Sequence, residues 1–308
     1  MSRHSAAIPL WEVHKAMTGP VEPRSRVIRW EEGVPLEDIC VRLADCVSAR
    51  PGPIDDSSLS ALLERGYDQA PVDDPATNQF WGLVDTEYLI ELKRRGEHLD
   101  GNDPHVRDES RYFRIGSFTS IFELLNKLRN HRAIIVVRVS SASEYGYGEF
   151  IVGLFTISDL NRHTIRTVLY RLLASVEAGL ARIVERQYSE PWDWIRLLNE
   201  NDQARVLGYW EISRRKGVDI GPIASLNLAH LIGIVAKSPQ LFGLLEFKSR
   251  SAFEKHAGCI PDFRNKIMHP VRPLVLGQQD VEGVYTATRA LEDLRDRIEK
   301  HTGKRRDA

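Results

Sequence analysis

Apolar positions in the first half of the chain change repeatedly between helical and strand spacing. Residues 58–74 ("SLSALLERGYDQAPVDD") predict a helix, a turn at Gly66 and a short strand around residues 70–72. Residues 80–96 ("FWGLVDTEYLIELKRRG") predict a strand followed by a helix. An acidic stretch with Gly and Pro at residues 98–110 indicates a loop. Together these segments give the order helix, strand, strand, helix.

The same order of elements occurs a second time. Residues 119–141 predict a helix and a strand rich in β-branched residues, and residues 149–173 predict a strand and a helix. The stretch "SLSALLERGYDQAPV" aligns with "SIFELLNKLRNHRAIIV", and "FWGLVDTEYL" aligns with "FIVGLFTISDL". An internal repeat of this size predicts two similar α/β units in tandem.

The region after about residue 161 has helical spacing and almost no strand signal. In "TVLYRLLASVEAGLARIVERQY" apolar residues recur every three or four positions, and the Ala, Leu, Glu and Arg content favours a helix. Further helices are predicted at residues 193–199, 203–215, 222–237, 240–257 and 280–300. The predicted fold class is therefore α+β, with a tandem α/β repeat followed by an all-α helical bundle.

Length and composition are those of a globular protein with two folded domains. The chain has 308 residues, of which 42% are hydrophobic and 28% are charged. We expect an irregular N-terminal segment at residues 1–35, a tandem-repeat domain at residues 36–162 and a helical domain at residues 163–308. The net charge of −1 gives no general attraction for duplex DNA, so any contact with nucleic acid must use a local patch.

The cysteines and the apolar runs indicate a cytoplasmic protein without a membrane partner. Cys40, Cys46 and Cys259 form no paired framework, which favours a reducing compartment. The first residues contain no apolar run of the signal-peptide kind. The longest apolar stretch, residues 223–236, is too short for a membrane span and predicts a buried helix.

Polar residues gather where the last predicted strand of the repeat ends, in "GLFTISDL" (residues 153–160). Gly153 has no side chain and lets a ligand approach the backbone. Thr156 and Ser158 offer hydroxyls to a phosphate or a ribose. Asp159 would open the next helix, and its carboxylate accepts two hydrogen bonds from a ribose diol. The alternative is structural, because Thr-x-x-Asp before a helix is also a capping arrangement.

The doubled unit over residues 36–165 resembles a tandem pair of cystathionine β-synthase-type (CBS) domains, whose last strand ends in G-h-x-[ST]-x-[ST]-D. The resemblance implies an adenine nucleotide as a regulatory ligand, bound by Gly153, Thr156, Ser158 and Asp159. In the first copy Asp85 replaces the Thr and Tyr88 replaces the Asp. We therefore expect at most one competent nucleotide site. Many domains of this type bind nothing, so a purely structural repeat remains the alternative.

A second polar cluster lies in "FRNKIMHP" (residues 263–270). Arg264 and Asn265 are adjacent, and His269 follows four residues after Asn265. Pro261 and Pro270 bracket the cluster and predict a short helix or a helix end. Histidine titrates near neutrality and serves as a base or an acid, whereas arginine stays charged and binds phosphate oxygens. The spacing alone is weak, because two other Arg…His pairs match it: Arg250…His256 and Arg295…His301.

The cluster resembles the R-N-x-x-x-H signature of HEPN domains, helical bundles that include many metal-independent endoribonucleases. The resemblance covers about residues 163–302. It implies that Arg264 and His269 are catalytic, that Asn265 orients them, that RNA is the substrate, and that catalysis requires no cofactor or metal. One Arg and one His are too few for an acid, a base and a phosphate-binding group, so we expect a homodimer. The preferred function is a nucleotide-regulated, toxin-like endoribonuclease.

Three alternatives stay open beside this one. In the first, the bundle is catalytically inactive and the protein is a nucleotide-sensing interaction module. In the second, the bundle serves only in dimerisation. At the level of residues, His269 caps a helix end while Arg264 pairs with a neighbour such as Asp262. A zinc site at His256, Cys259 and His269 lacks a fourth ligand and a standard spacing.

Overall fold

The computed structural model describes residues 35–74, 79–143, 146–218 and 220–302. Contacts along the chain divide it into a unit at residues 1–33 and a unit at residues 34–308, and every described residue belongs to the second unit. The predicted irregular segment 1–35 therefore lies, as far as residue 34, outside the described residues.

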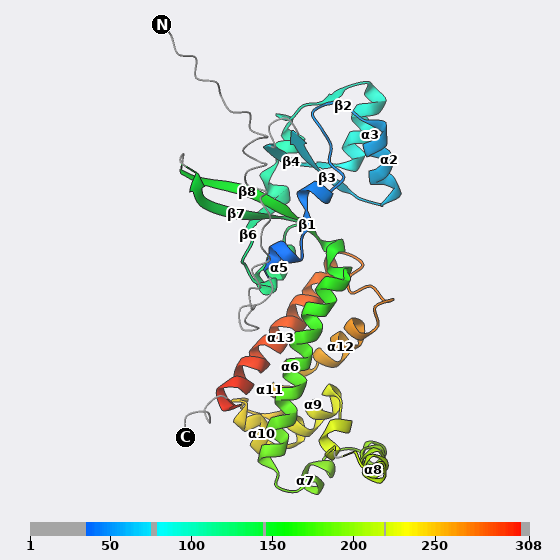
Figure 1. Cartoon of the computed structure of the whole chain (residues 1–308), viewed down its shortest axis with the longest axis vertical. Coiled ribbons are helices and arrows are strands. Elements are labelled where there is room, and N and C mark those ends of the chain that lie inside the picture. Colours follow the sequence, from blue (N-terminus) through cyan, green and yellow to red (C-terminus); the bar gives the residue numbers. More distant parts are fainter. Residues whose placement is uncertain (1–34, 75–78, 144–145, 219, 303–308) are drawn as a thin grey trace. The chain divides into compact units, whose positions relative to one another are not determined.

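The first copy of the repeat has the predicted order of elements (Figure 1). It consists of α2 (Asp56–Glu64), β3 (Gln69–Asp74), β4 (Gln79–Asp85) and α3 (Thr86–Arg95). The two strands pair antiparallel, with Gln69 opposite Asp85. The carboxylate of Asp55 starts α2 by accepting a hydrogen bond from the Ser58 N–H. Gly96 ends α3 in the left-handed conformation, with φ of 69°, which glycine adopts without steric cost.

The second copy has the same order and belongs to a larger sheet. It consists of α5 (Ile121–Leu128), β7 (Ala133–Ser143), β8 (Gly146–Thr156) and a 3₁₀ turn, η5 (Ile157–Asn161). The sheet has the strand order β1-β8-β7-β6, with β1 at Val41–Arg42 and β6 at Tyr112–Gly116. β6 runs parallel to β7, and the other pairs are antiparallel. One apolar cluster, which includes Leu83 of the first copy and Ile135 of the second, packs the two sheets together.

Short elements precede the first copy and connect it to the second. Before α2 lie η2 (Leu36–Asp38), η3 (Leu43–Asp45) and β2 (Gly52–Pro53). Between the copies lie β5 (His98–Leu99), α4 (Pro104–Arg107) and η4 (Glu109–Arg111). β6 was not predicted, because its five residues, "YFRIG", include an exposed arginine in their centre and are too few to show alternation. The 98–110 stretch, predicted as a loop, contains β5, α4 and part of η4.

Two long helices, α6 (His163–Gln187) and α13 (Gln278–Thr302), pack against each other and organise the rest of the chain. Gly179 permits their close approach, since a Cβ there would lie 2.7 Å from Cγ2 of Ile298. The shorter helices are α7 (Pro191–Ile195), α8 (Glu200–Arg215), η6 (Pro222–Ser225), α9 (Leu228–Lys237), α10 (Pro239–Leu244), α11 (Arg250–Ala257) and α12 (Ile260–Met268). Described residues after residue 163 form no strand. The predicted α+β class, a tandem α/β repeat followed by an all-helical region, is confirmed.

Two predicted helices are wrong in their extent. The predicted helix 222–237 is divided because Leu226 is extended and Asn227 starts α9 by accepting a hydrogen bond from the His230 N–H. The predicted helix 240–257 is divided at Glu246, which has a left-handed φ of 61°, and Ser249 then caps α11. In both cases a local capping side chain outweighs the continuous apolar spacing.

Helical and repeat regions share one hydrophobic core. Leu124 and Phe155 of the second copy belong to the same buried cluster as Leu180 of α6 and Leu291 of α13. Side chains also cross this junction: Gln278 Nε2 donates to the Leu128 carbonyl at 2.5 Å. Within the described part of the chain, no helix is both long enough and apolar enough to cross a membrane.

Candidate functional site

The turn that follows β8 is closed by the side chain of Asp159. Its Oδ2 accepts hydrogen bonds from the Thr156 N–H at 2.7 Å and from the Thr156 hydroxyl at 2.9 Å. Thr156 Oγ1 also lies 2.8 Å from Ser158 Oγ. These contacts form a capping box on η5, with Thr156 as the N-cap. Asp159 therefore does not open the long helix as predicted; α6 begins only at His163, because the turn is of the 3₁₀ type.

The second carboxylate oxygen of Asp159 takes no part in the capping box. Oδ1 lies 3.9 Å from Nη1 of Arg162, and the side chain is 14% exposed. Burial raises the pKa of Asp159 above its ordinary value, although the Thr156 hydrogen bonds and the Arg162 charge act in the opposite direction. One oxygen thus remains for a ligand hydroxyl, and the predicted contact with a ribose stays a prediction.

Gly153 is covered by the chain itself. A Cβ at this position would fall on the carbonyl oxygen of Val41, far inside van der Waals contact, and 2.7 Å from Sγ of Cys40. β1 runs beside β8 here, with Arg42 opposite Gly153. Gly82, the equivalent residue of the first copy, is covered in the same way by the Val106 carbonyl. In both copies the glycine makes room for a neighbouring segment of the chain. At Gly153 this segment takes the place in which a ligand was expected.

In the equivalent turn of the first copy, an arginine pairs with the aspartate. Asp85 Oδ2 lies 2.8 Å from Nη1 of Arg111, and Gln69 Nε2 donates to Asp85 Oδ1 at 3.3 Å. A cavity of about 290 Å³ opens beside them, lined by Gln69, Asp85, Ser110, Arg111, Asn130, His131 and Arg132. Arg111 therefore neutralises the charge of Asp85, the residue that replaces the threonine of the motif in this copy.

These cationic residues were not predicted as site residues. Arg111 directly precedes β6, which was not predicted, and Arg132 directly precedes β7. Nδ1 of His131 is buried and makes no hydrogen bond within the described part of the chain. The sequence places Arg111 and Arg132 directly before strands of the second copy, and this position could have identified them. The starts of these strands lie beside the end of β4, where Asp85 is found.

Tyr88, which stands where the motif of the second copy has Asp159, makes a structural contact. Its hydroxyl donates to Asp103 Oδ2 at 2.6 Å, which raises the pKa of Tyr88 to about 12. Its ring stacks on His105 with the ring centres 4.3 Å apart. Tyr88 therefore anchors the connection that contains α4.

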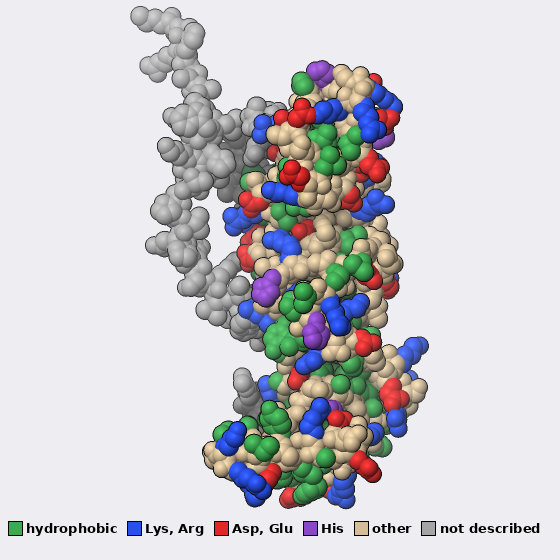
Figure 2. Space-filling model, turned by 90° about the vertical axis from the view of Figure 1, so that its right-hand side faces the viewer, with side chains coloured by type: hydrophobic (Ala, Val, Ile, Leu, Met, Phe, Trp, Pro, Cys, Tyr) green, Lys and Arg blue, Asp and Glu red, His purple; other side chains and the backbone are tan. Residues whose placement is uncertain are grey.

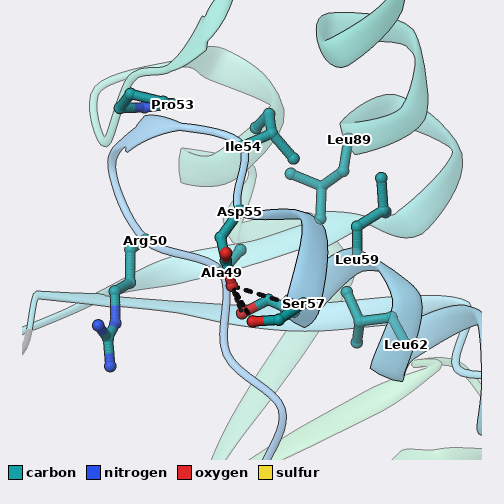
Figure 3. Close-up of a pocket in the computed structure, with 10 residues that line it drawn as sticks. Ala49, Arg50, Pro53, Ile54, Asp55, Ser57, Leu59, Leu62 and Leu89 are labelled. Atoms are coloured by element: carbon teal, nitrogen blue, oxygen red, sulfur yellow. Dashed lines mark hydrogen bonds between the residues drawn. The ribbon is translucent and has the colours of Figure 1, made fainter.

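Another cavity, of about 260 Å³, lies at the start of α2 (Figure 3). Ile54, Leu59 and Leu89 form its apolar side, and the guanidinium of Arg50 points away from them. Asp55 accepts hydrogen bonds from the Ser57 and Ser58 hydroxyls, which hold the pKa of its carboxyl below the ordinary range. The polar groups of this cavity already cap α2, and no predicted site residue lines it.

The Arg264 cluster lies on the predicted short helix. α12 has Pro261 in its first turn and ends at Met268, so that His269 is its C-cap, with φ of −110° and ψ of 83°. The backbone N–H of His269 still donates to the Asn265 carbonyl at 3.2 Å. His269 thus occupies the helix-capping position that the structural alternative assigned to it. Its side chain is exposed and remains available for chemistry.

Arg264 contacts Asn265 and faces a groove. Nη1 of Arg264 lies 3.5 Å from Oδ1 of Asn265. The groove has a volume of about 330 Å³ and is bounded by α6, η6, α9 and α12. Among the described residues that line it, only Arg264 and Glu177 are charged. Burial raises the pKa of Glu177, and the nearby Arg264 charge opposes this shift. No contact described in this structure joins the side chains of Arg264 and His269.

In the other two Arg…His pairs, Arg250, His256 and Arg295 make local polar contacts. His256 Nε2 lies 3.1 Å from the Ala290 carbonyl oxygen, and Arg250 pairs with Glu254 at 2.8 Å. Arg295 lies 3.2 Å from a carboxylate oxygen of Asp296 on its own helix. Among the residues described, no group of three or more His, Cys, Asp or Glu side chains is placed to hold a metal ion.

Comparison with known proteins finds similarity only among solved structures. No family model matches the chain, and no curated protein matches it. The CBS domain of a putative transporter from Clostridium difficile 630 is 23% identical, covers 45% of this chain and 98% of its own, and has a TM-score of 0.34. The CBS domain of the bacterial CNNM/CorC family Mg²⁺ transporter in complex with ATP is 19% identical, covers 49% and 94%, and scores 0.30. A CBS domain-containing protein from Bacillus anthracis str. Ames Ancestor is 17% identical, covers 42% and 91%, and scores 0.31. Each similarity extends over less than half of this chain, and the fold class rests on its own element order and strand register.

Proposed function

We propose that the helical region is a metal-independent endoribonuclease and that the tandem repeat regulates it by binding an adenine nucleotide. The observation that carries the proposal is α12, on which Arg264 contacts Asn265 and which the exposed His269 caps at its C-terminal end. A cation and an accessible imidazole on the same short helix supply the two kinds of group that RNA transesterification needs.

The chemistry assigns one role to each residue. The imidazole of His269 takes the proton of a ribose 2′-hydroxyl, and the 2′-oxygen then attacks the adjacent phosphorus. The guanidinium of Arg264 binds the phosphate oxygens and stabilises the added negative charge, while Asn265 orients it. The bond to the 5′-oxygen breaks, and this oxygen receives a proton from an acid. The products are a 2′,3′-cyclic phosphate and a 5′-hydroxyl.

A second copy of the chain supplies the missing acid in this proposal. One chain offers one imidazole at the site, which cannot act as base and acid in the same step. A two-fold axis beside α12 would place His269 and Arg264 of both copies around one cleft. Tyr170 and Met268, which line the groove and are 47% and 41% exposed, would be covered there. Figure 2 shows exposed hydrophobic side chains among basic ones over the helical region.

Purified protein incubated with mixed RNA in the presence of EDTA is expected to cut it and to leave 2′,3′-cyclic phosphate ends. The reaction has no step that uses a metal ion, so the rate with EDTA should equal the rate without it. End-group analysis of the fragments and a time course on gels measure both. Cleavage that stops in EDTA, or 3′-hydroxyl ends, would contradict the proposal.

The non-catalytic interaction protein is the second candidate. It is favoured because no described contact joins the side chains of Arg264 and His269 within one copy. The same RNA experiment decides between the two candidates, since a silent bundle leaves the RNA intact.

Adenine nucleotide binding is expected to weaken when Asp159 is replaced by alanine. Oδ1, which lies outside the capping box, would accept hydrogen bonds from a ribose diol, and each bond to a charged group contributes about 1.5–3 kcal/mol. Because burial raises the pKa of Asp159, affinity should increase as the pH rises through that pKa and the carboxylate ionises. Calorimetry with AMP, ADP and ATP measures both effects.

Asp55→Ala is the matched control, since Asp55 also caps a short helix but lies at a different turn. Binding that survives Asp159→Ala and disappears in Arg132→Ala would move the ligand to the cavity beside Asp85. A wild-type protein that binds none of the three nucleotides at millimolar concentration would overturn the regulatory half of the proposal and leave the cleavage half standing.

A further inference from the structure

The turn after β8 is tied directly to the segment that follows His269. Asn161, the last residue of η5, accepts hydrogen bonds at Oδ1 from the Leu274 N–H at 2.6 Å and the Val275 N–H at 3.1 Å. Its Nδ2 donates to the Val275 carbonyl at 2.9 Å. One amide side chain thus makes three hydrogen bonds to backbone more than a hundred residues away, and it fixes the far end of the loop that His269 begins.

Arg166, on the first turns of α6, holds the near end of the same loop. Its Nη1 donates to the Lys266 carbonyl at 2.6 Å, and its Nη2 donates to the Arg272 carbonyl. These two carbonyls lie on either side of His269. The guanidinium therefore spans the loop, and a displacement of either end would break one of its bonds.

The sequence of α12 explains why an arginine is needed there. In a helix the Lys266 carbonyl would accept from the N–H four residues later, but that residue is Pro270, which has no N–H. The carbonyls at a helix C-terminus also carry partial negative charge and favour a cation. Arg166 supplies both the donor and the charge.

Burying the guanidinium of Arg166 costs folding free energy, which indicates that the residue does more than fill space. It is 4% exposed, and its Nε makes no hydrogen bond within the described residues. Its described side-chain partners are carbonyl oxygens and not a carboxylate. A buried cation without a counter-ion costs more free energy than an apolar side chain of similar size.

We propose that Asn161 and Arg166, here named the 161–166 clamp, are positioning residues that hold His269 in place and link it to the Thr156–Asp159 turn. The proposal rests on the proposed function for the role of His269 and adds the route of its regulation. Asp159, which closes the capping box, lies two residues before Asn161. The helix α6 follows, in which the Arg166 N–H donates to the Arg162 carbonyl. A ligand hydrogen-bonded to Oδ1 of Asp159, the oxygen outside the capping box, leaves the box intact and stabilises the turn, so the expected sign of regulation is activation.

Amide hydrogen exchange of the full chain tests the clamp without any RNA. In Asn161→Ala the Leu274 and Val275 amides lose their acceptor, so peptides covering residues 269–277 should exchange at least about tenfold faster. Arg166→Met should have the same effect from the other end. Asp159→Ala, which touches no residue of this loop, should accelerate the same peptides through the turn. Peptides from the middle of α13 should not change.

Activity measurements separate positioning from folding. Asn161→Ala and Arg166→Met should lower kcat at least about tenfold with little change in KM for RNA, and Arg166→Lys should recover part of it. Arg250→Met serves as the matched control, since Arg250 is exposed on α11 and its described partner is Glu254 of the same helix.

Unchanged exchange at residues 269–277 in both clamp variants, or a wild-type kcat in both, would overturn the clamp. Unchanged exchange in Asp159→Ala would overturn its link to the turn. If Arg166→Met fails to fold, Asn161→Ala and Arg166→Lys still decide the question. If the wild-type protein cuts no RNA, the proposed function fails, whereas the exchange result still tests the clamp.

Discussion

Alanine at Arg264 or at His269 is expected to reduce RNA cleavage at least about 100-fold. General acid–base catalysis and charge stabilisation at a phosphate each contribute factors of this order. The loss should appear in kcat, because both residues act on the reacting groups. The fold should persist, since the side chain of His269 is exposed and that of Arg264 is half-buried at the groove. Initial rates in EDTA, with circular dichroism on each variant, measure the two effects separately.

Arg250→Ala and His256→Ala are the matched controls for this prediction. They form another Arg…His pair of similar spacing, but their side chains serve an ion pair with Glu254 and a contact to the Ala290 carbonyl. Both variants should cut RNA at the wild-type rate, although His256→Ala should be less stable. If a protein that carries both Arg264→Ala and His269→Ala still cut RNA, these two residues would not be the catalytic ones.

Mixing wild-type and inactive protein tests the shared site. If two copies complete one cleft with both imidazoles, exchange of subunits between wild-type protein and an excess of His269→Ala protein should lower the activity per wild-type chain, because the mixed dimer has only one His269. Light scattering of the wild-type protein should show a dimer at the concentrations used. A strictly monomeric protein that still cuts RNA would contradict the composite site.

Gly153→Ala is expected to destabilise the protein by about 1–3 kcal/mol or more, because overpacking forces the backbone to shift. The added Cβ would fall on the carbonyl oxygen of Val41, which is backbone and has little freedom to move. β8 is paired on both sides, to β1 and β7, so a shift would disturb two strand pairs. Chemical denaturation gives the change in the free energy of unfolding.

Gly208→Ala provides the control. Gly208 lies within α8, and a Cβ there would meet nothing within 4 Å, so alanine should stabilise the helix by roughly 0.5–1 kcal/mol. Gly153→Ala protein as stable as the wild type would show that β1 does not cover this glycine. The space beside Gly153 would then be open to a ligand.

The repeat was the part of the fold most open to prediction. Apolar spacing and the alignment of "FWGLVDTEYL" with "FIVGLFTISDL" gave the element order of both copies, because each copy buries the same face. Spacing did not reveal β6 or β1, which are short and gain their stability from neighbouring strands. It also did not reveal the breaks at Asn227 and Glu246, where a capping side chain or a left-handed residue interrupts an apolar run.

The candidate site was predictable only in its local part. Arg264, Asn265 and His269 are neighbours in sequence, and the two prolines defined their helix. Glu177, Asn161 and Arg166 reach α12 and its loop from α6 and the turn before it, about a hundred residues earlier in the chain. No spacing rule connects such residues, since their contact depends on the tertiary packing of two helices.

The shared hydrophobic core has a consequence for the way in which the proposed regulation would work. Leu124 and Phe155 of the repeat are buried in the same cluster as Leu180 and Leu291 of the long helices. Units that share one core unfold together as a single cooperative unit and do not act as independent bodies on a flexible linker. The binding energy of a ligand at the repeat would therefore reach the helical region as a change in local stability, without a hinge or a large domain movement.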